Sequence, residues 1–144
     1  MKKGIIRPLA ICIFRYHDSI LVAEGYDSVK GENYYRPIGG IELGESSSDA
    51  VIREVKEEID ADICDLNYLG MIENLFTLNG AAGHGIVMVY DASFVDKSFY
   101  KTESFEGKEG DGSIFKLIWF PLSEFQEGNM RLVPENLLGL LDKK

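Results

Sequence analysis

The sequence predicts an α+β domain, an α/β/α sandwich built on a mixed β-sheet, and assigns residues 1–144 to one domain. Two observations predict this fold class. Segments rich in β-branched and aromatic residues outnumber helical segments, and only one long helical pattern interrupts them. A doubly wound fold would alternate strands and helices more regularly. A chain of 144 residues is also long enough to bury the core of a single domain.

The expected strands are short apolar segments bounded by polar residues or glycines. They cover residues 4–15, 18–24, 34–38, 63–77, 86–95 and 113–120. The first two form a hairpin, and the glycine-rich segment 79–85 is expected to connect two later strands. Residues 101–112 are polar and are expected to form a long loop. Pro121 ends the last strand, and Pro134 begins a short helix that ends near Leu141.

A helix of about four turns is expected from Ser47 to Ile59. Ser46, with Asp49 three residues later, resembles a capping box. At 100° per residue, Ile52, Val55 and Ile59 share one side with Val51 at its margin, and we expect that side to pack on the sheet.

Glu54, Glu57 and Glu58 are expected together on the opposite side of this helix. Like charges at these spacings destabilise a helix by about 0.2–0.5 kcal/mol each, so the pattern indicates either a solvated acidic face or a metal site. A divalent cation such as Mg²⁺ or Mn²⁺ converts the repulsion into a ligand set. Arg53 lies on the flank, where it either holds one glutamate by a forked hydrogen bond or forms a plain surface ion pair.

Composition excludes several classes of function. The 24 acidic against 15 basic residues give a net charge of −9, which opposes binding to long nucleic acids or anionic lipid. Two histidines cannot build a histidine-rich zinc site, and the cysteines, Cys12 and Cys64, are expected to be buried thiols. The longest early apolar segment is too short for a signal peptide or a membrane span. We therefore expect a cytoplasmic protein without a membrane partner.

The residues before and within the helix carry a specific spacing. The loop glycines Gly39 and Gly40 allow close approach of a ligand to the backbone. The matching positions are Gly39, Glu45, Arg53, Glu54, Val55, Glu57 and Glu58. This segment resembles the signature of the Nudix hydrolase family, G-x5-E-x7-R-E-U-x-E-E-x-G-U, where U is aliphatic. Two positions depart from it, because Asp60 replaces the second glycine and Ala61 is small for the last aliphatic residue.

The resemblance implies a metal-dependent hydrolase that cleaves a nucleoside diphosphate linked to another moiety. Its metal ligands would be Glu54, Glu57 and Glu58, with the backbone carbonyl of Ile38 as a further candidate. Gly39, Gly40 and Glu45 would support the site, and Arg53 would take part in catalysis. The general base stays open between Glu54 and a carboxylate of residues 101–112, of which Glu109 is our choice.

Substrate contacts and the alternative function depend on other residues. Arg36 enters the glycine turn directly and is a candidate for binding a phosphate. Tyr35, with Tyr34 and Phe76, is a candidate for stacking on a base, although strand aromatics are usually core. The expected partner is a small nucleoside diphosphate derivative, and homodimerisation stays open. The alternative is a Nudix-fold sensor or binding module that does not hydrolyse its ligand. The altered signature position at Asp60 favours this alternative, and the intact glutamates oppose it.

Overall fold

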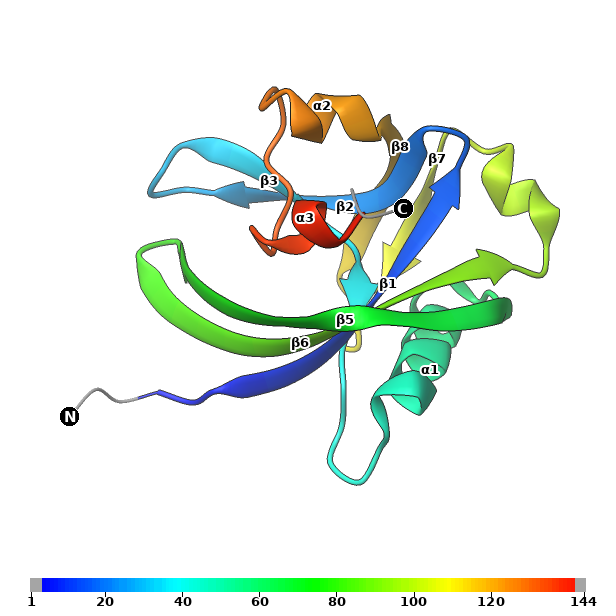
Figure 1. The fold of residues 1–144 in the computed structure, drawn as a ribbon, viewed down its shortest axis with the longest axis horizontal. Coiled ribbons are helices and arrows are strands. Elements are labelled where there is room, and N and C mark those ends of the chain that lie inside the picture. Colours follow the sequence, from blue (N-terminus) through cyan, green and yellow to red (C-terminus); the bar gives the residue numbers. More distant parts are fainter. Residues whose placement is uncertain (1–3, 142–144) are drawn as a thin grey trace.

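A computed structural model describes residues 4–141 and places three α-helices and one short 3-10 helix around one mixed sheet (Figure 1). The elements are β1 (Arg7–Tyr16), β2 (Ser19–Asp27), β3 (Glu32–Arg36), β4 (Ile38–Gly39), α1 (Ser47–Ile59), β5 (Ile63–Leu78), β6 (Ala81–Phe94), η1 (Lys97–Tyr100), β7 (Ser104–Lys108), β8 (Ile114–Pro121), α2 (Leu122–Gln126) and α3 (Leu137–Leu141). None of the helices within the described residues has the length and apolar character needed to cross a membrane.

The sheet has the strand order β5-β6-β1-β2-β8-β7, with β3 added to β2 and β4 added to β1. Strand β1 pairs in parallel with β6 and antiparallel with β2 and β4. The predicted mixed sheet is therefore confirmed, and β1 is the strand that joins its two halves.

Alternating residues of β1 supply two apolar layers. Ala10, Cys12 and Phe14 belong to the cluster that contains the buried residues of α1, whereas Ile11 and Ile13 belong to the cluster that contains α2 and α3. Figure 1 shows α1 on one side of β1, and α2 and α3 on the other. This is the predicted sandwich.

Helix α1 has the predicted bounds, but its buried face differs from the expected one. The Ser46 hydroxyl accepts a hydrogen bond from the Asp49 N–H at 3.2 Å, as the capping pattern predicted. The buried residues of α1 are Ala50, Val51, Val55 and Glu58. Ile52, expected to pack on the sheet, is 48% exposed. The buried stripe is rotated toward Ala50, which the expectation from large aliphatic residues overlooked.

Two segments that were expected to be loops form strands. The connection between β5 and β6 is the two-residue turn Asn79-Gly80 rather than residues 79–85. The segment 101–112 contains β7, which pairs with β8. Strand β8 ends at Pro121 as expected, and helix α2, which was not expected, begins directly after it. Of the two thiols, Cys12 is buried as expected and Cys64 is only half-buried.

Candidate active site

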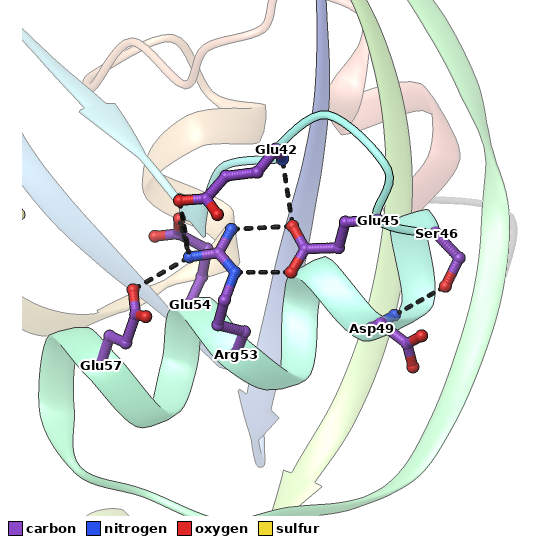
Figure 2. Close-up of polar contacts among 7 residues, drawn as sticks. All are labelled: Glu42, Glu45, Ser46, Asp49, Arg53, Glu54 and Glu57. Carbon is purple, nitrogen blue, oxygen red and sulfur yellow. Dashed lines mark hydrogen bonds and ion pairs between the residues drawn. The ribbon is translucent and has the colours of Figure 1, made fainter.

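Arg53 ties the loop before α1 to the carboxylates of the helix (Figure 2). Its Nε and Nη2 donate to the two carboxylate oxygens of Glu45, the second at 2.9 Å. Its Nη1 donates to Glu54 and to Glu57, each at 2.9 Å. Glu45 also accepts the backbone N–H of Glu42 at 3.0 Å, which fixes the loop against the helix.

These contacts set the charge and orientation of the surrounding groups. The hydrogen bond from Arg53 holds the pKa of Glu45 below its usual value, so this carboxylate stays ionised. A planar guanidinium can hold several carboxylates at once, which an ammonium cannot do with the same geometry. Arg53 therefore orients Glu54 and Glu57, and Glu45 orients Arg53.

Glu58 is buried, which opposes the alternative in which the three glutamates form a solvated acidic face. It is 6% exposed, and its Oε2 has no hydrogen-bond partner. Burial, together with the nearby carboxylates of Glu54 and Glu109, raises the pKa of Glu58 to about 8. Glu58 lies three residues after Val55, so the buried stripe of α1 continues onto this carboxylate.

Glu54 lies beside this group in a similar environment. Its side chain is 17% exposed, and burial raises its pKa, although the hydrogen bond from Arg53 opposes that rise. The carboxylates of Glu57 and Glu109 also raise the pKa of Glu54. The site thus concentrates negative charge where water is partly excluded, and such charge favours binding of a cation.

Glu109 reaches these helix carboxylates from the turn that follows β7. Its Oε1 accepts a hydrogen bond from Nη2 of Arg36 at 2.9 Å, and both side chains are about one-third exposed. The Arg36 guanidinium also lies over the ring of Phe115, 5.6 Å from its centroid. The structure therefore brings Arg36 and Glu109 against α1, although they lie 73 residues apart in the sequence.

The two loop glycines allow close contacts of different kinds. A Cβ atom on Gly39 would lie 2.3 Å from the backbone oxygen of Ala10, so this glycine lets β4 pack against β1. A Cβ on Gly40 would lie 2.6 Å from Oε1 of Glu54. Gly40 thus leaves the space that Glu54 occupies, and the preceding Ile38 is buried in the pairing with β1.

The two neighbouring tyrosines of β3 lie on opposite faces of the strand. Tyr35, the candidate for stacking, is 8% exposed and contacts the rings of Phe120 and Phe125 at centroid distances of 5.3 and 6.0 Å. This packing leaves little of its ring for a ligand. Tyr34 instead lines a cleft on the other face of β3.

The carboxylate cluster supplies the oxygen donors that a divalent cation prefers. Among residues 4–141, no three Asp, Glu, His or Cys side chains lie close enough together to hold a metal ion, and Arg53 bonds both Glu54 and Glu57. However, Glu58 presents a buried oxygen without a partner, and its neighbours are carboxylates. Oxygen donors of this kind suit Mg²⁺ or Mn²⁺.

Comparisons with known proteins find relatives of this chain and solved structures with the same fold. The NAD-capped RNA hydrolase NudC of Pseudomonas aeruginosa is 29% identical over 90 residues, which are 62% of this chain and 30% of that protein. The match therefore spans less than a third of that relative's length. A NUDIX hydrolase from Nitrosomonas europaea has the same fold, with a TM-score of 0.65, 16% identity and coverage of 96% of this chain and 87% of that chain.

A second solved structure, an ADP compounds hydrolase, has a TM-score of 0.60 at 19% identity and covers 95% of this chain and 71% of its own. Both structures support the α+β fold. The family model described as the NUDIX domain matches residues 6–140, which is nearly the whole chain. The chain therefore belongs to the Nudix family.

Proposed function

We propose that this protein hydrolyses the pyrophosphate bond of a nucleoside diphosphate linked to another moiety, using Mg²⁺ or Mn²⁺. The observation that carries the proposal is the buried, unpartnered oxygen of Glu58 beside Glu54 and Glu109. The names of two similar proteins support it, since NAD and ADP compounds both contain a pyrophosphate linkage. The net charge of −9 favours a small substrate over a long nucleic acid.

The helix carboxylates would hold the metal ion. Glu54, Glu57 and Glu58 are the proposed ligands, with the carbonyl of Ile38 as a further oxygen donor. A bound divalent cation neutralises phosphate charge and lowers the pKa of a water molecule. Arg53 positions Glu54 and Glu57, so its contribution to catalysis is to keep their oxygens oriented toward one place.

Arg36 and Glu109 would act on the substrate side of the cluster. The Arg36 guanidinium has the geometry to bind a phosphate by two parallel hydrogen bonds, in place of its present bond to Glu109. Glu109, once released, would accept a proton from the attacking water. Glu54 is the other candidate for this base, and a pH–rate profile in which only one of the Glu54→Gln and Glu109→Gln variants loses its acidic limb distinguishes them.

The departure from the family signature at Asp60 leaves the helix intact. Asp60 adopts φ 53° and ψ 43°, and its N–H donates to the carbonyl of Lys56 at 2.9 Å. This left-handed conformation is the one that a glycine cap supplies, and Asp tolerates it better than most residues. The geometry therefore does not favour the inactive binding module.

A substrate panel tests the proposal. Nucleotide sugars, ADP-ribose, dinucleoside polyphosphates, nucleoside triphosphates and capped RNA are incubated with the protein and Mg²⁺ or Mn²⁺, and the products are separated by chromatography. We expect at least one small pyrophosphate to be cleaved only with metal, and Lys56→Gln to keep that activity because Lys56 only pairs with Asp60 and Asp62 at the surface. Binding of these compounds without cleavage of any of them would support the binding module instead.

A further inference from the structure

Two kinds of contact hold Arg36, the residue proposed to bind a substrate phosphate. Its Nη2 donates to the carboxylate of Glu109 at 2.9 Å, and its Nη1 donates to the carbonyl of Pro37 at 3.4 Å. Its guanidinium also lies over the ring of Phe115, 5.6 Å from the ring centroid. An incoming phosphate competes for the N–H donors, but a contact through the face of the guanidinium uses none of them. The contact with Phe115 can therefore persist when the phosphate replaces Glu109.

The ring of Phe115 is itself fixed by the neighbouring strand. Phe115 lies in β8, directly opposite Gly107 of β7. A Cβ atom on Gly107 would be only 2.4 Å from Cζ of Phe115, so the ring lies across the backbone of β7 at the one position in that strand where no side chain blocks it. Phe115 also packs against the buried cluster that contains the buried aliphatic residues of α1. The ring is therefore held by both β7 and the core, and an alanine at position 107 would have to displace it.

The turn between β7 and β8, which carries Glu109, is closed by its own hydrogen bonds. The N–H of Glu109 donates to the carbonyl of Ser113 at 2.8 Å, and the N–H of Gly112 donates to the carbonyl of Glu109 at 2.9 Å. Oδ1 of Asp111 accepts the N–H and the hydroxyl of Ser113 at 2.9 and 2.7 Å, as in an Asx-turn. None of these bonds involves Arg36. Loss of the bond between Arg36 and Glu109 should therefore leave the turn, and the ring that follows it, in place.

Arg36 needs such a support once Glu109 no longer binds it. Its side chain is about one-third exposed, and it lines a cleft of about 780 Å³ that Tyr34 also lines. If a flexible arginine side chain becomes ordered only when the ligand binds, the affinity is lower, because the lost rotamer freedom opposes binding. A stacked ring limits the guanidinium to fewer orientations before the ligand arrives. The ring of Phe115 should therefore increase the affinity of Arg36 for a phosphate without contacting the phosphate.

We propose that Phe115 is a positioning residue, which holds the Arg36 guanidinium in place after a substrate phosphate has replaced Glu109. Gly107 is part of the same device, because it leaves the space in which the ring lies. The role of Arg36 toward phosphate rests on the proposed function, whereas the contact between Arg36 and Phe115 is present in the protein without a ligand. If Phe115 served the core alone, its replacement would change stability but not the behaviour of Arg36.

Steady-state kinetics on the compound that the substrate panel identifies give the first test. Phe115→Leu should raise KM about 2- to 5-fold, the size expected for one cation–π contact at a partly exposed site. The value of kcat should change little, because Arg36 binds the phosphate in the ground state as well as in the transition state. Phe115→Tyr keeps an aromatic ring and should restore the wild-type KM. In the Arg36→Ala background, Phe115→Leu should not raise KM further, since the residue that it positions is gone.

Two further variants separate the ring contact from general damage to the sheet. Gly107→Ala keeps the ring of Phe115 but displaces it, so this variant should also raise KM, and the test does not depend on the folding of Phe115→Leu. Ile114→Ala is the matched control, because Ile114 precedes Phe115 in β8 and is 57% exposed. It should leave both KM and kcat unchanged. Thermal melting of each variant measures the accompanying change in stability.

Two measurements need no activity. In nuclear magnetic resonance spectra of the free protein, the Nε–H signal of Arg36 should move toward its random-coil position in Phe115→Leu and stay in place in Ile114→Ala. Calorimetric titration with methylenediphosphonate and Mg²⁺, which cannot lead to hydrolysis, should show weaker binding in Phe115→Leu by the same factor as the rise in KM. An unchanged Arg36 signal, or an equal loss of affinity with and without Arg36, would overturn the proposal.

The outcomes also separate this proposal from the proposed function. If no pyrophosphate is hydrolysed but Phe115→Leu weakens methylenediphosphonate only when Arg36 is present, the positioning role stands and the proposed function fails. If a pyrophosphate is hydrolysed with metal and Phe115→Leu has the wild-type KM and kcat, the proposed function stands and the positioning role fails.

Discussion

Replacing Glu58 by glutamine should stabilise the metal-free protein while abolishing most of its activity. The carboxyl group of Glu58 is buried, and its pKa is raised from 4.5 to about 8. A folded-state pKa above the unfolded value means that the folded protein binds this proton more tightly. The stability associated with the proton is therefore complete below about pH 4.5 and is lost as the pH rises to about 8.

The size of this loss follows from the same two values. A rise in pKa from 4.5 to about 8 corresponds to at most about 5 kcal/mol above pH 8. Glu54 and Glu109 share the same charge repulsion, so we expect about 1–3 kcal/mol from Glu58 itself. For a chain of this length that equals roughly 3–10 °C in melting temperature. Glu58→Gln removes the buried charge, and its amide can donate to the neighbouring carboxylates.

The effect on catalysis should have the opposite sign. A neutral amide oxygen binds Mg²⁺ poorly, and the loss of one electrostatic contact in a transition state costs about 10²–10³ in rate. The stabilisation by saturating metal, which arises by mass action, should also shrink. Thermal melting from pH 5 to 9, with EDTA and with Mg²⁺, and the rate of pyrophosphate hydrolysis measure both effects on the same preparation.

Two substitutions at neighbouring positions serve as controls. Glu57→Gln also removes a glutamate, and Lys56→Gln also changes the charge of the helix. Glu57 has a side chain that is 61% exposed, so Glu57→Gln should change metal-free stability much less than Glu58→Gln does. Lys56→Gln should change the free energy of unfolding by no more than about 0.5 kcal/mol. It should also leave the rate of hydrolysis unchanged. If the metal-free melting temperature of Glu58→Gln at pH 8 is lower than that of the unsubstituted protein, the stability argument is refuted. If Glu58→Gln hydrolyses its substrate at the wild-type rate, Glu58 is not part of the metal site.

Four further outcomes follow from the contacts of the site. EDTA should abolish hydrolysis, and Mg²⁺ or Mn²⁺ should restore it, whereas unchanged turnover in chelated protein excludes the mechanism. Arg53→Lys should lower the hydrolysis rate about 10- to 100-fold with folding retained, because an ammonium cannot hold the carboxylates as a guanidinium does. Gly40→Ala should displace Glu54 and lower metal affinity by a similar factor, measured by titration, while Gly139→Ala, which has open space around it, should not. Asn79→Gly keeps the positive φ of the turn but removes the hydrogen bonds from Ser28 to the Asn79 side chain, so the melting temperature should fall slightly with circular dichroism unchanged.

Local sequence signals predicted α1 and its ends because capping and periodicity operate within a few residues. The strands that were not predicted depend on pairing between residues that are distant in the sequence. Strand β7 consists largely of polar residues, and it forms because β8 offers a partner in which the ring of Phe115 covers Gly107. The segment after Asn79 remained a predicted loop for the same reason, since the ring of Phe76 covers Gly83 only after the two strands have paired.

Some features of the candidate site also follow from local sequence, and others follow from contacts between distant residues. Spacing within one helix was enough to place Glu54 near both Glu57 and Glu58, but burial of Glu58 depends on what packs against α1. The meeting of Arg36 with Glu109 requires the whole ladder from β3 through β2 and β8 to β7, so no local pattern contains it. That ladder also places Arg36 in the lining of the cleft. The Arg36 guanidinium therefore lines this cleft and also bonds Glu109 beside the carboxylate cluster. If Arg36 binds the substrate phosphate as proposed, that phosphate must displace Glu109, so we expect substrate binding to free Glu109.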